Sequence, residues 1–211
     1  MAGKFITFEG IDGSGKTTQI NLLETELKKH GIALLILREP GGTKLSEKIR
    51  EILLDSENMN LSLSSESLLF ISARAQLMAE KIKPALKRDR VVICDRFSDS
   101  TVAYQGYGRG LNVKYLEELN NYATDSIQPD CTIILDINPE KASLRMGNDV
   151  LDRMESTGLE FFSRVREGYY EIAHRYPQRC IIIDGSQSES KVFDLIMKEV
   201  NNKLSKEMSC S

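Results

Sequence analysis

Residues 10–17 have the types and spacing of a phosphate-binding loop. Gly10, Gly15, Lys16 and Thr17 fill the pattern G-x-x-x-x-G-K-[ST]. The glycines let the backbone curl so that several N–H groups point inward, and a helix beginning after the loop adds its positive dipole end. Lys16 would then meet the β and γ phosphates of a nucleotide, and the Thr17 hydroxyl would bind Mg²⁺.

The flanking sequence supports this interpretation. The apolar run 5–8 precedes the loop as a short strand, and Ile20, Leu23 and Leu27 follow it at helical spacing. The strand and helix favour a phosphate site over a glycine-rich turn that binds nothing. The residues predicted to bind the phosphates of ATP are Gly10, Asp12, Gly13, Ser14, Gly15, Lys16, Thr17 and Thr18.

A second group of side chains could bind a nucleobase. Phe70 and Arg74 are four residues apart in a helical segment, so they share one face. A ring and a fork of N–H donors in that relation can stack on a base and bond its edge. Without further context, the alternative is that Phe70 is a core residue and Arg74 a solvated charge.

The segment 98–106 is predicted to be a helix with polar pairs at the same spacing. Ser100 pairs with Tyr104, and Thr101 pairs with Gln105. These pairs place hydroxyl groups and an amide on one broad face. Such a face suits a polar heterocycle and its sugar.

Charged residues end two of the predicted strands. Asp95 ends the run 90–96, as a magnesium-linked carboxylate does in many phosphate-loop enzymes, and Arg96 beside it could clamp a phosphate. Thr17 and Asp95 are therefore the predicted metal ligands. Asp136 competes for this role, but a capping or structural carboxylate is favoured there because no cation follows it.

The elements that must position these residues alternate along the chain. Strands are predicted at 5–8, 32–37, 90–96, 131–137 and 180–183, and helical patterns separate them, including a long helix at about 66–86. This alternation predicts one α/β domain over 1–211, a five-stranded parallel sheet with helices on both faces. Asn138 and Pro139 are expected to begin a helix. Residues 146–154 lack periodicity and are predicted to be a mobile loop.

Composition excludes several classes of protein. The net charge is −3, with 28 Lys and Arg against 31 Asp and Glu, so no nucleic-acid partner is expected. The apolar runs are too short to span a bilayer and no signal peptide opens the chain, so a cytoplasmic protein is predicted. We expect buried thiols at Cys94, Cys131 and Cys180, and Cys210 in a polar tail.

Four motifs together resemble those of bacterial thymidylate kinases, in the nucleoside-monophosphate kinase group. They are residues 5–18 (FITFEGIDGSGKTT), 38–43 (REPGGT), 95–106 (DRFSDSTVAYQG) and 151–155 (LDRME). The resemblance runs from Phe5 to about Tyr170 and implies a P-loop NTPase fold with a short lid at about 146–155. The second and third motifs are far more specific than the phosphate loop.

Carried over position by position, the resemblance implies roles for most of these residues. Phe70 would stack on thymine, Arg74 would donate to its edge, and Thr101 and Gln105 would complete base recognition. Tyr104 would sit against the sugar. The remaining predicted substrate contacts are Asp12 at the sugar 3′-hydroxyl, Ser100 on the polar face, and Arg38, Arg50 and Arg96 around the acceptor phosphate.

The predicted reaction is transfer of the γ-phosphoryl group of ATP, with Mg²⁺, to dTMP. Catalysis would consist of placing the two substrates and neutralising the charge of the transferring group. The predicted catalytic residues are Lys16, Arg96, Asp12 and a lid arginine, for which Arg153 is preferred to Arg145. The resemblance also implies a homodimer. The alternatives are a kinase for another deoxynucleotide or nucleoside, and a nucleotide-binding switch that has no acceptor.

Overall fold

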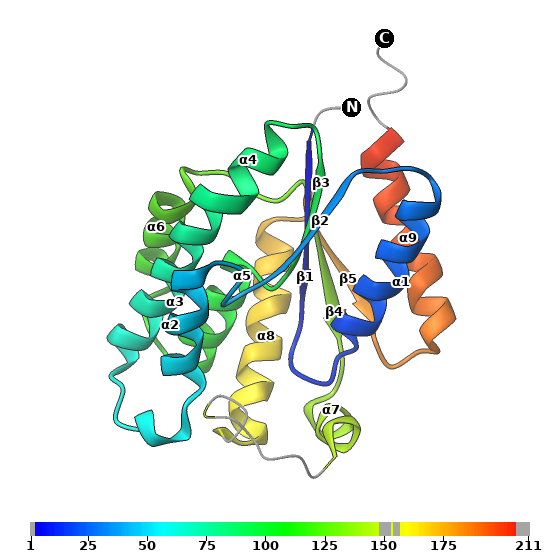
Figure 1. The fold of residues 1–211 in the computed structure, drawn as a ribbon. Helices are drawn as coiled ribbons and strands as arrows, with labels where there is room; N and C mark the ends of the chain where they lie inside the picture. The colour runs from blue at the N-terminus through cyan, green and yellow to red at the C-terminus, as the bar shows by residue number, and fades with distance from the viewer. Residues whose placement is uncertain (1–2, 148–152, 154–156, 206–211) are drawn as a thin grey trace.

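A parallel β-sheet forms the centre of the computed structural model, which describes residues 3–147, 153 and 157–205. The five strands lie in the order β2-β3-β1-β4-β5 (Figure 1). Every pairing is parallel. The strands are β1 (Lys4–Glu9), β2 (Leu34–Arg38), β3 (Val91–Asp95), β4 (Cys131–Asp136) and β5 (Cys180–Asp184).

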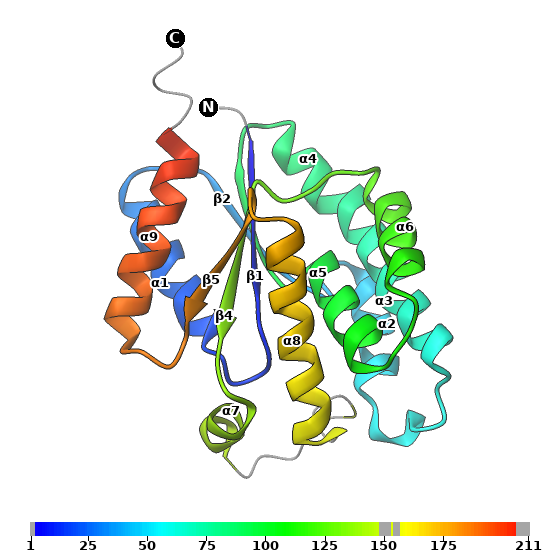
Figure 2. The same ribbon diagram turned by 180° about the vertical axis from the view of Figure 1, so that it is seen from behind.

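Helices connect the strands and cover the sheet. Figures 1 and 2 show α1 and α9 on one face, and α3, α4 and α8 on the other. The α-helices are α1 (Lys16–Lys29), α2 (Lys44–Leu54), α3 (Leu63–Leu77), α4 (Lys83–Leu86), α5 (Ser98–Thr101), α6 (Val113–Thr124), α7 (Pro139–Met146), α8 (Leu159–Arg175) and α9 (Glu189–Ser205). The predicted α/β architecture is confirmed.

The strands bury apolar side chains on both faces of the sheet. Successive side chains of a strand point to opposite faces. In β1, Phe5 packs with the residues of α3 and α4, while Ile6 and Phe8 pack with those of α1 and α9. Continuous apolar strands are what a parallel sheet covered on both sides requires.

Helix boundaries differ from the predictions in two places. The helix expected to start near Glu66 starts at Leu63, because the Ser62 hydroxyl accepts the Ser65 N–H at 3.1 Å. It is not one α-helix, since the π-helical segment η2 (Met78–Ile82) separates α3 from α4. The helix expected at 98–106 likewise becomes π-helical after α5, in η3 (Val102–Gly108).

The predicted helix start at Asn138 and the predicted buried thiols are confirmed. The Asn138 side chain accepts hydrogen bonds from the Glu140 and Lys141 N–H groups, and Pro139 is the first residue of α7. Cys94, Cys131 and Cys180 are buried free thiols. No helix in the described part of the chain is long and apolar enough to span a membrane. Cys210 and most of the predicted lid lie outside the described residues.

All strands end at one edge of the sheet, where charged side chains gather. The last residues of the strands are Glu9, Arg38, Asp95, Asp136 and Asp184. The loop between β1 and α1 lies at this edge, and α7 lies just beyond it (Figure 1). Open α/β sheets bind their ligands at the carboxyl ends of the strands.

Candidate active site

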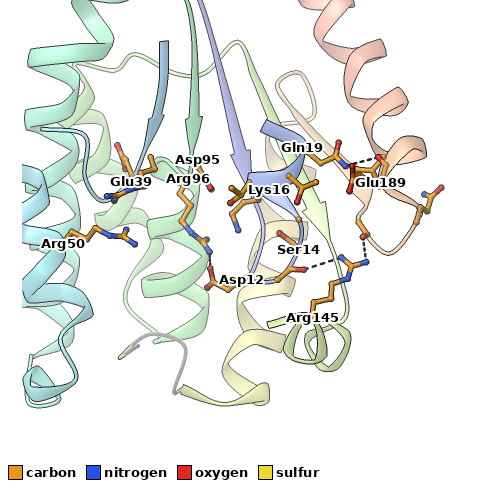
Figure 3. A pocket seen from close by; sticks show the side chains of 18 residues that line it. Asp12, Ser14, Lys16, Gln19, Glu39, Arg50, Asp95, Arg96, Arg145 and Glu189 are labelled. Atoms are coloured by element: carbon orange, nitrogen blue, oxygen red, sulfur yellow. Dashed lines mark hydrogen bonds and ion pairs between the residues drawn. The ribbon is translucent and has the colours of Figure 1, made fainter. Parts of the chain in front are cut away.

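The loop between β1 and α1 lines one side of a cavity of about 640 Å³ (Figure 3). Its lining includes residues 12–18 of the predicted phosphate-binding set. Gly13 and Gly15 have φ angles of 76° and 96°, which favour glycine, and a Cβ on Gly13 would lie 2.5 Å from the Ala142 carbonyl oxygen. Gly10 contributes to the curl of the loop, at φ 131°, but does not line this cavity.

Lys16 is the first residue of α1 and lies inside the loop. Its Nζ donates to the carbonyl oxygens of Gly10 and Ile11, both at 3.1 Å. Burial and then the Arg96 charge lower the pKa of the Lys16 ammonium, and Asp12 and Asp95 oppose that shift. An anion beside this group would restore the favourable charge balance.

Asp95 and Thr17 line the same cavity and form a fitting pair for a divalent cation. Asp95 Oδ1 is buried and has no hydrogen-bond partner in the described part of the protein. Such an unpaired carboxylate oxygen is costly unless a cation binds it. Mg²⁺ prefers one or two carboxylate or hydroxyl ligands together with substrate phosphates, so these residues suit it.

Arg96 connects the loop to the neighbouring strand. Its Nη2 lies 2.6 Å from Asp12 Oδ1, and its Nη1 donates to the Gly10 carbonyl oxygen at 3.0 Å. The guanidinium also lies 4.9 Å from the centre of the Tyr104 ring. Burial alone would raise the pKa of Asp12, but Arg96 and Lys16 hold it at about 2. Asp12 is therefore an anion that orients a cation at the cavity wall.

Glu9 stabilises the turn that carries Arg96. Arg96 has a φ of 68°, a left-handed conformation that costs a non-glycine residue about 1 kcal/mol or more. The fully buried Glu9 carboxylate accepts the Phe97 N–H at 2.8 Å and the Ser100 and Tyr169 hydroxyls at 2.5 and 2.9 Å. Two of these bonds hold the residues that directly follow Arg96, and the third ties them to α8.

Glu9 should make folding stability depend on pH. Burial and then the charge of Asp99 raise its pKa from 4.5 to about 7. Between these values the folded chain holds a proton that the unfolded chain has released, so the free energy of unfolding falls as pH rises. From pH 5.5 to 8, the wild type should lose about 2 kcal/mol more than Glu9→Gln in urea titrations. Equal losses in both proteins would contradict this prediction.

A second, narrower pocket of about 100 Å³ adjoins the first. We call the first the phosphate cavity and the second the base pocket, after the ligands predicted for their residues. Asp12, Glu39, Arg50 and Arg96 line both pockets, so the two are continuous. The second pocket brings together Phe70 from α3 with the polar face of α5 and η3. Its other lining residues are Pro40, Leu54, Arg74, Ser100, Thr101, Tyr104 and Gln105.

Arg74 lines this pocket, but the protein uses its guanidinium fully. Its nitrogens donate to the Glu39 carboxylate, the Thr101 hydroxyl and the Phe97 carbonyl at 2.8 to 2.9 Å, and to Asn120 at 2.6 Å. The residue is 1 % exposed. Arg74 is a buried ion-pair partner and not a solvated charge. Phe70 packs against a small hydrophobic cluster and also lines the pocket.

Two predicted residues lie apart from the base pocket. Arg38 lines only the phosphate cavity, where it pairs with Glu47 at 2.9 Å. Arg153 lines neither cavity, because it forms an ion pair with the buried Glu66 at 2.7 Å. Arg145 reaches the phosphate cavity instead and donates to the Gly185 carbonyl at 3.0 Å (Figure 3).

Asp136 is a structural carboxylate, as predicted. Arg166 contacts it through two nitrogens at 2.6 and 2.7 Å, and the Tyr170 hydroxyl donates to it at 2.8 Å. It does not line the phosphate cavity. The cation that neutralises it is Arg166 of α8, which lies 30 residues away in the sequence. The residues next to Asp136 in the sequence therefore do not reveal this ion pair.

Sequence reasoning missed Glu39 and Glu66, both buried carboxylates beside the predicted site. Glu39 was visible in the motif at 38–43, where a charged residue stands in a loop after a strand. Glu66 precedes Phe70 by one helical turn, on the face that carries it toward Gln105. The hydrogen bond between Glu66 and Gln105 is visible only in the tertiary structure, where α3 and η3 come together.

A phosphate loop that continues into a pocket with a ring and hydrogen-bonding groups defines a P-loop kinase of a small nucleotide. A sequence model described as thymidylate kinase matches residues 8–196. The chain therefore belongs to the thymidylate kinase family, whose members are ATP-dependent nucleoside-monophosphate kinases.

Relatives and a solved structure agree with this assignment. The chain is 50 % identical over 204 residues to a thymidylate kinase from Caldanaerobacter subterraneus subsp. tengcongensis, covering 97 % of this chain and 98 % of that one. It is 46 % identical to one from Pelobacter propionicus, covering 94 % of both. A crystal structure of thymidylate kinase from Ehrlichia chaffeensis is 39 % identical, with a TM-score of 0.76 and 95 % and 99 % coverage.

Proposed function

We propose that the two continuous pockets are the donor and acceptor halves of one active site. The chain belongs to the thymidylate kinase family, so its reaction is transfer of the γ-phosphoryl group of ATP to dTMP, giving dTDP and ADP. The observation that supports this arrangement most strongly is the set of residues shared by both pockets. Asp12, Arg50 and Arg96 stand where the two substrates would meet.

The role proposed for each residue follows from the pocket that it lines. Residues 12–18 hold the ATP phosphates, with Lys16 at the β and γ phosphates. Arg50 and Arg96 bind the acceptor phosphate, and Phe70 stacks on the base. The acceptor is already an anionic oxygen, so no protein nucleophile is required, and catalysis is placement and charge neutralisation.

We also propose that Thr17 and Asp95 hold Mg²⁺. When bound, the ion neutralises phosphate charge. Arg153 remains our proposed lid arginine, and this role requires its guanidinium to leave Glu66. Residues 146–155 are the proposed lid within a single domain of 1–211.

The experiment that tests the function compares acceptors. A coupled assay for ADP, with ATP as donor, would offer dTMP, dUMP, dCMP and dAMP in turn. We expect the highest kcat/KM with dTMP. A higher value with another monophosphate would favour a different nucleotide kinase, and no ADP with any acceptor would favour a binding switch.

Asp12→Ala should impair the use of dTMP more than the binding of ATP. Asp12 orients Arg96 and contacts the Tyr104 hydroxyl at 3.3 Å, both on the acceptor side. Loss of such a charged group typically costs about 10²-fold in rate. We expect kcat/KM for dTMP to fall by about that factor, while the Kd of ATP, measured by calorimetry, changes less than about threefold. An equal loss in both would contradict the acceptor role.

We further propose a cytoplasmic homodimer. Three buried free thiols fit a reducing compartment. Apolar side chains exposed on the adjacent helices α3 and α6, among them Leu68, Tyr115 and Tyr122, could be covered by a second copy. Sedimentation equilibrium should give twice the mass of the chain, and a monomer at micromolar concentration would refute the dimer.

A further inference from the structure

Glu66 lies beneath the base pocket and has no place in the reaction described above. It is fully buried, and its two oxygens share Arg109 but differ in their second partner. Oε1 accepts the Gln105 Nε2 group at 3.0 Å and Arg109 Nε at 3.4 Å. Oε2 pairs with Arg153 at 2.7 Å and with Arg109 at 3.4 Å. A buried carboxylate with two guanidinium partners is an acceptor only.

This contact determines which way the Gln105 amide points. A carboxylate can only accept, so the NH₂ end of Gln105 must face Glu66 and the Oε1 end must face away. Gln105 lines the base pocket, and no described residue donates to its Oε1. The pocket therefore presents a fixed acceptor to the edge of a base.

Thr101 stands one helical turn before Gln105 and presents an adaptable group. Its oxygen accepts from Arg74 at 2.8 Å, which leaves its proton free to turn into the pocket. A hydroxyl can also accept a second hydrogen bond through its other lone pair. Thr101 can thus meet either a carbonyl or an amino group, and Gln105 carries the discrimination.

We propose that Glu66 is a positioning residue that makes the pocket specific for a pyrimidine with an N3–H group. Thymine offers N3–H to the Gln105 oxygen and O4 to Thr101. Cytosine offers an unprotonated N3, which would place two acceptors face to face. This inference rests on the proposed function, because it assigns the second pocket to the base of the acceptor.

Glu66→Gln is the variant that tests the proposal. Its carbonyl oxygen should turn to the Arg109 guanidinium, which does not depend on the position of Arg153, and its NH₂ group should then face Gln105. The Gln105 amide would flip and present a donor to the base. We expect the ratio of kcat/KM for dTMP to that for dCMP to fall by about 30-fold or more, mainly through loss of dTMP use.

Asp99→Asn is the matched control, because it also converts a buried carboxylate on this side of the sheet into an amide. Asp99 pairs with Arg179 at 2.6 Å and does not line either substrate pocket. It should keep the wild-type ratio. A folded Glu66→Gln protein with an unchanged ratio, or with equal losses for both nucleotides, would overturn the proposal. A wild type inactive on dTMP would instead refute the proposed function.

A measurement on the wild type covers the case in which Glu66→Gln does not fold. Nuclear magnetic resonance should detect a scalar coupling across the hydrogen bond from Gln105 Nε2 to the Glu66 carboxylate carbon. The coupling should persist when dTMP is added. Its absence, or its loss on adding dTMP, would overturn the proposed orientation.

Discussion

Lys16→Ala should lower turnover by about 10³-fold or more while the protein stays folded. Lys16 is the only lysine among the residues that line the phosphate cavity, within the described parts of the chain. Its ammonium is buried against the loop carbonyls, so it is already placed beside the predicted β and γ phosphates. Removing it leaves charge on the transferring group without compensation. Steady-state ADP formation with ATP and dTMP measures the effect.

The fold of this variant is expected to survive because Lys16 is the first residue of α1 and its side chain is not part of the apolar core. Lys28→Ala is the matched control, since Lys28 lies in the last turn of the same helix and pairs with Glu24 on the surface, at 2.7 Å. It should retain wild-type turnover. Near-normal activity in Lys16→Ala would refute the assignment of the loop.

Arg96→Ala should also lower kcat/KM for dTMP by about 10³-fold. The change removes a cation from the junction of the two pockets and leaves Lys16 as the cation that still faces Asp12. The less compensated carboxylate would repel the acceptor phosphate. Arg96→Lys should recover only part of the activity, because lysine keeps the charge but lacks the planar fork. Kinetics with varied dTMP at saturating ATP would separate these effects.

A double variant distinguishes the two parts of the Arg96 effect. In Arg96→Ala with Asp12→Asn, the repelling charge is gone, so kcat/KM should exceed that of Arg96→Ala alone. Arg175→Ala is the matched surface control, because Arg175 pairs with Glu117 and neither residue lines either pocket. A double variant no better than Arg96→Ala would show that Asp12 does not act on the acceptor through its charge.

The strands and most helices were predictable because their signals are local. An apolar run such as 91–95 can be stable only in the interior, and the periodicity of α8 identifies its buried face directly. The change to π-helix at 78–82 and 102–108 was not predictable. It depends on the neighbours that each turn meets, which the residues of the turn do not specify.

The residues of the site likewise fall into those that the sequence could predict and those that it could not. The phosphate loop was readable because its residues are contiguous, and covalent adjacency already places them together. Arg74 was expected to face a base and does line the second pocket, but the sequence could not show that Glu39 and Asn120, far away in the chain, contact its guanidinium. Arg153 was preferred to Arg145, and in the structure the buried Glu66 holds it outside the phosphate cavity.

By itself the sequence determined the α/β fold, the phosphate loop and the residue types of the second pocket. The tertiary structure alone decided which buried charges meet, as for Glu9 with the Arg96 turn and Glu66 with Gln105. The reason is physical. A buried carboxylate must find hydrogen-bond donors, but the packing of distant elements decides which donors lie within reach.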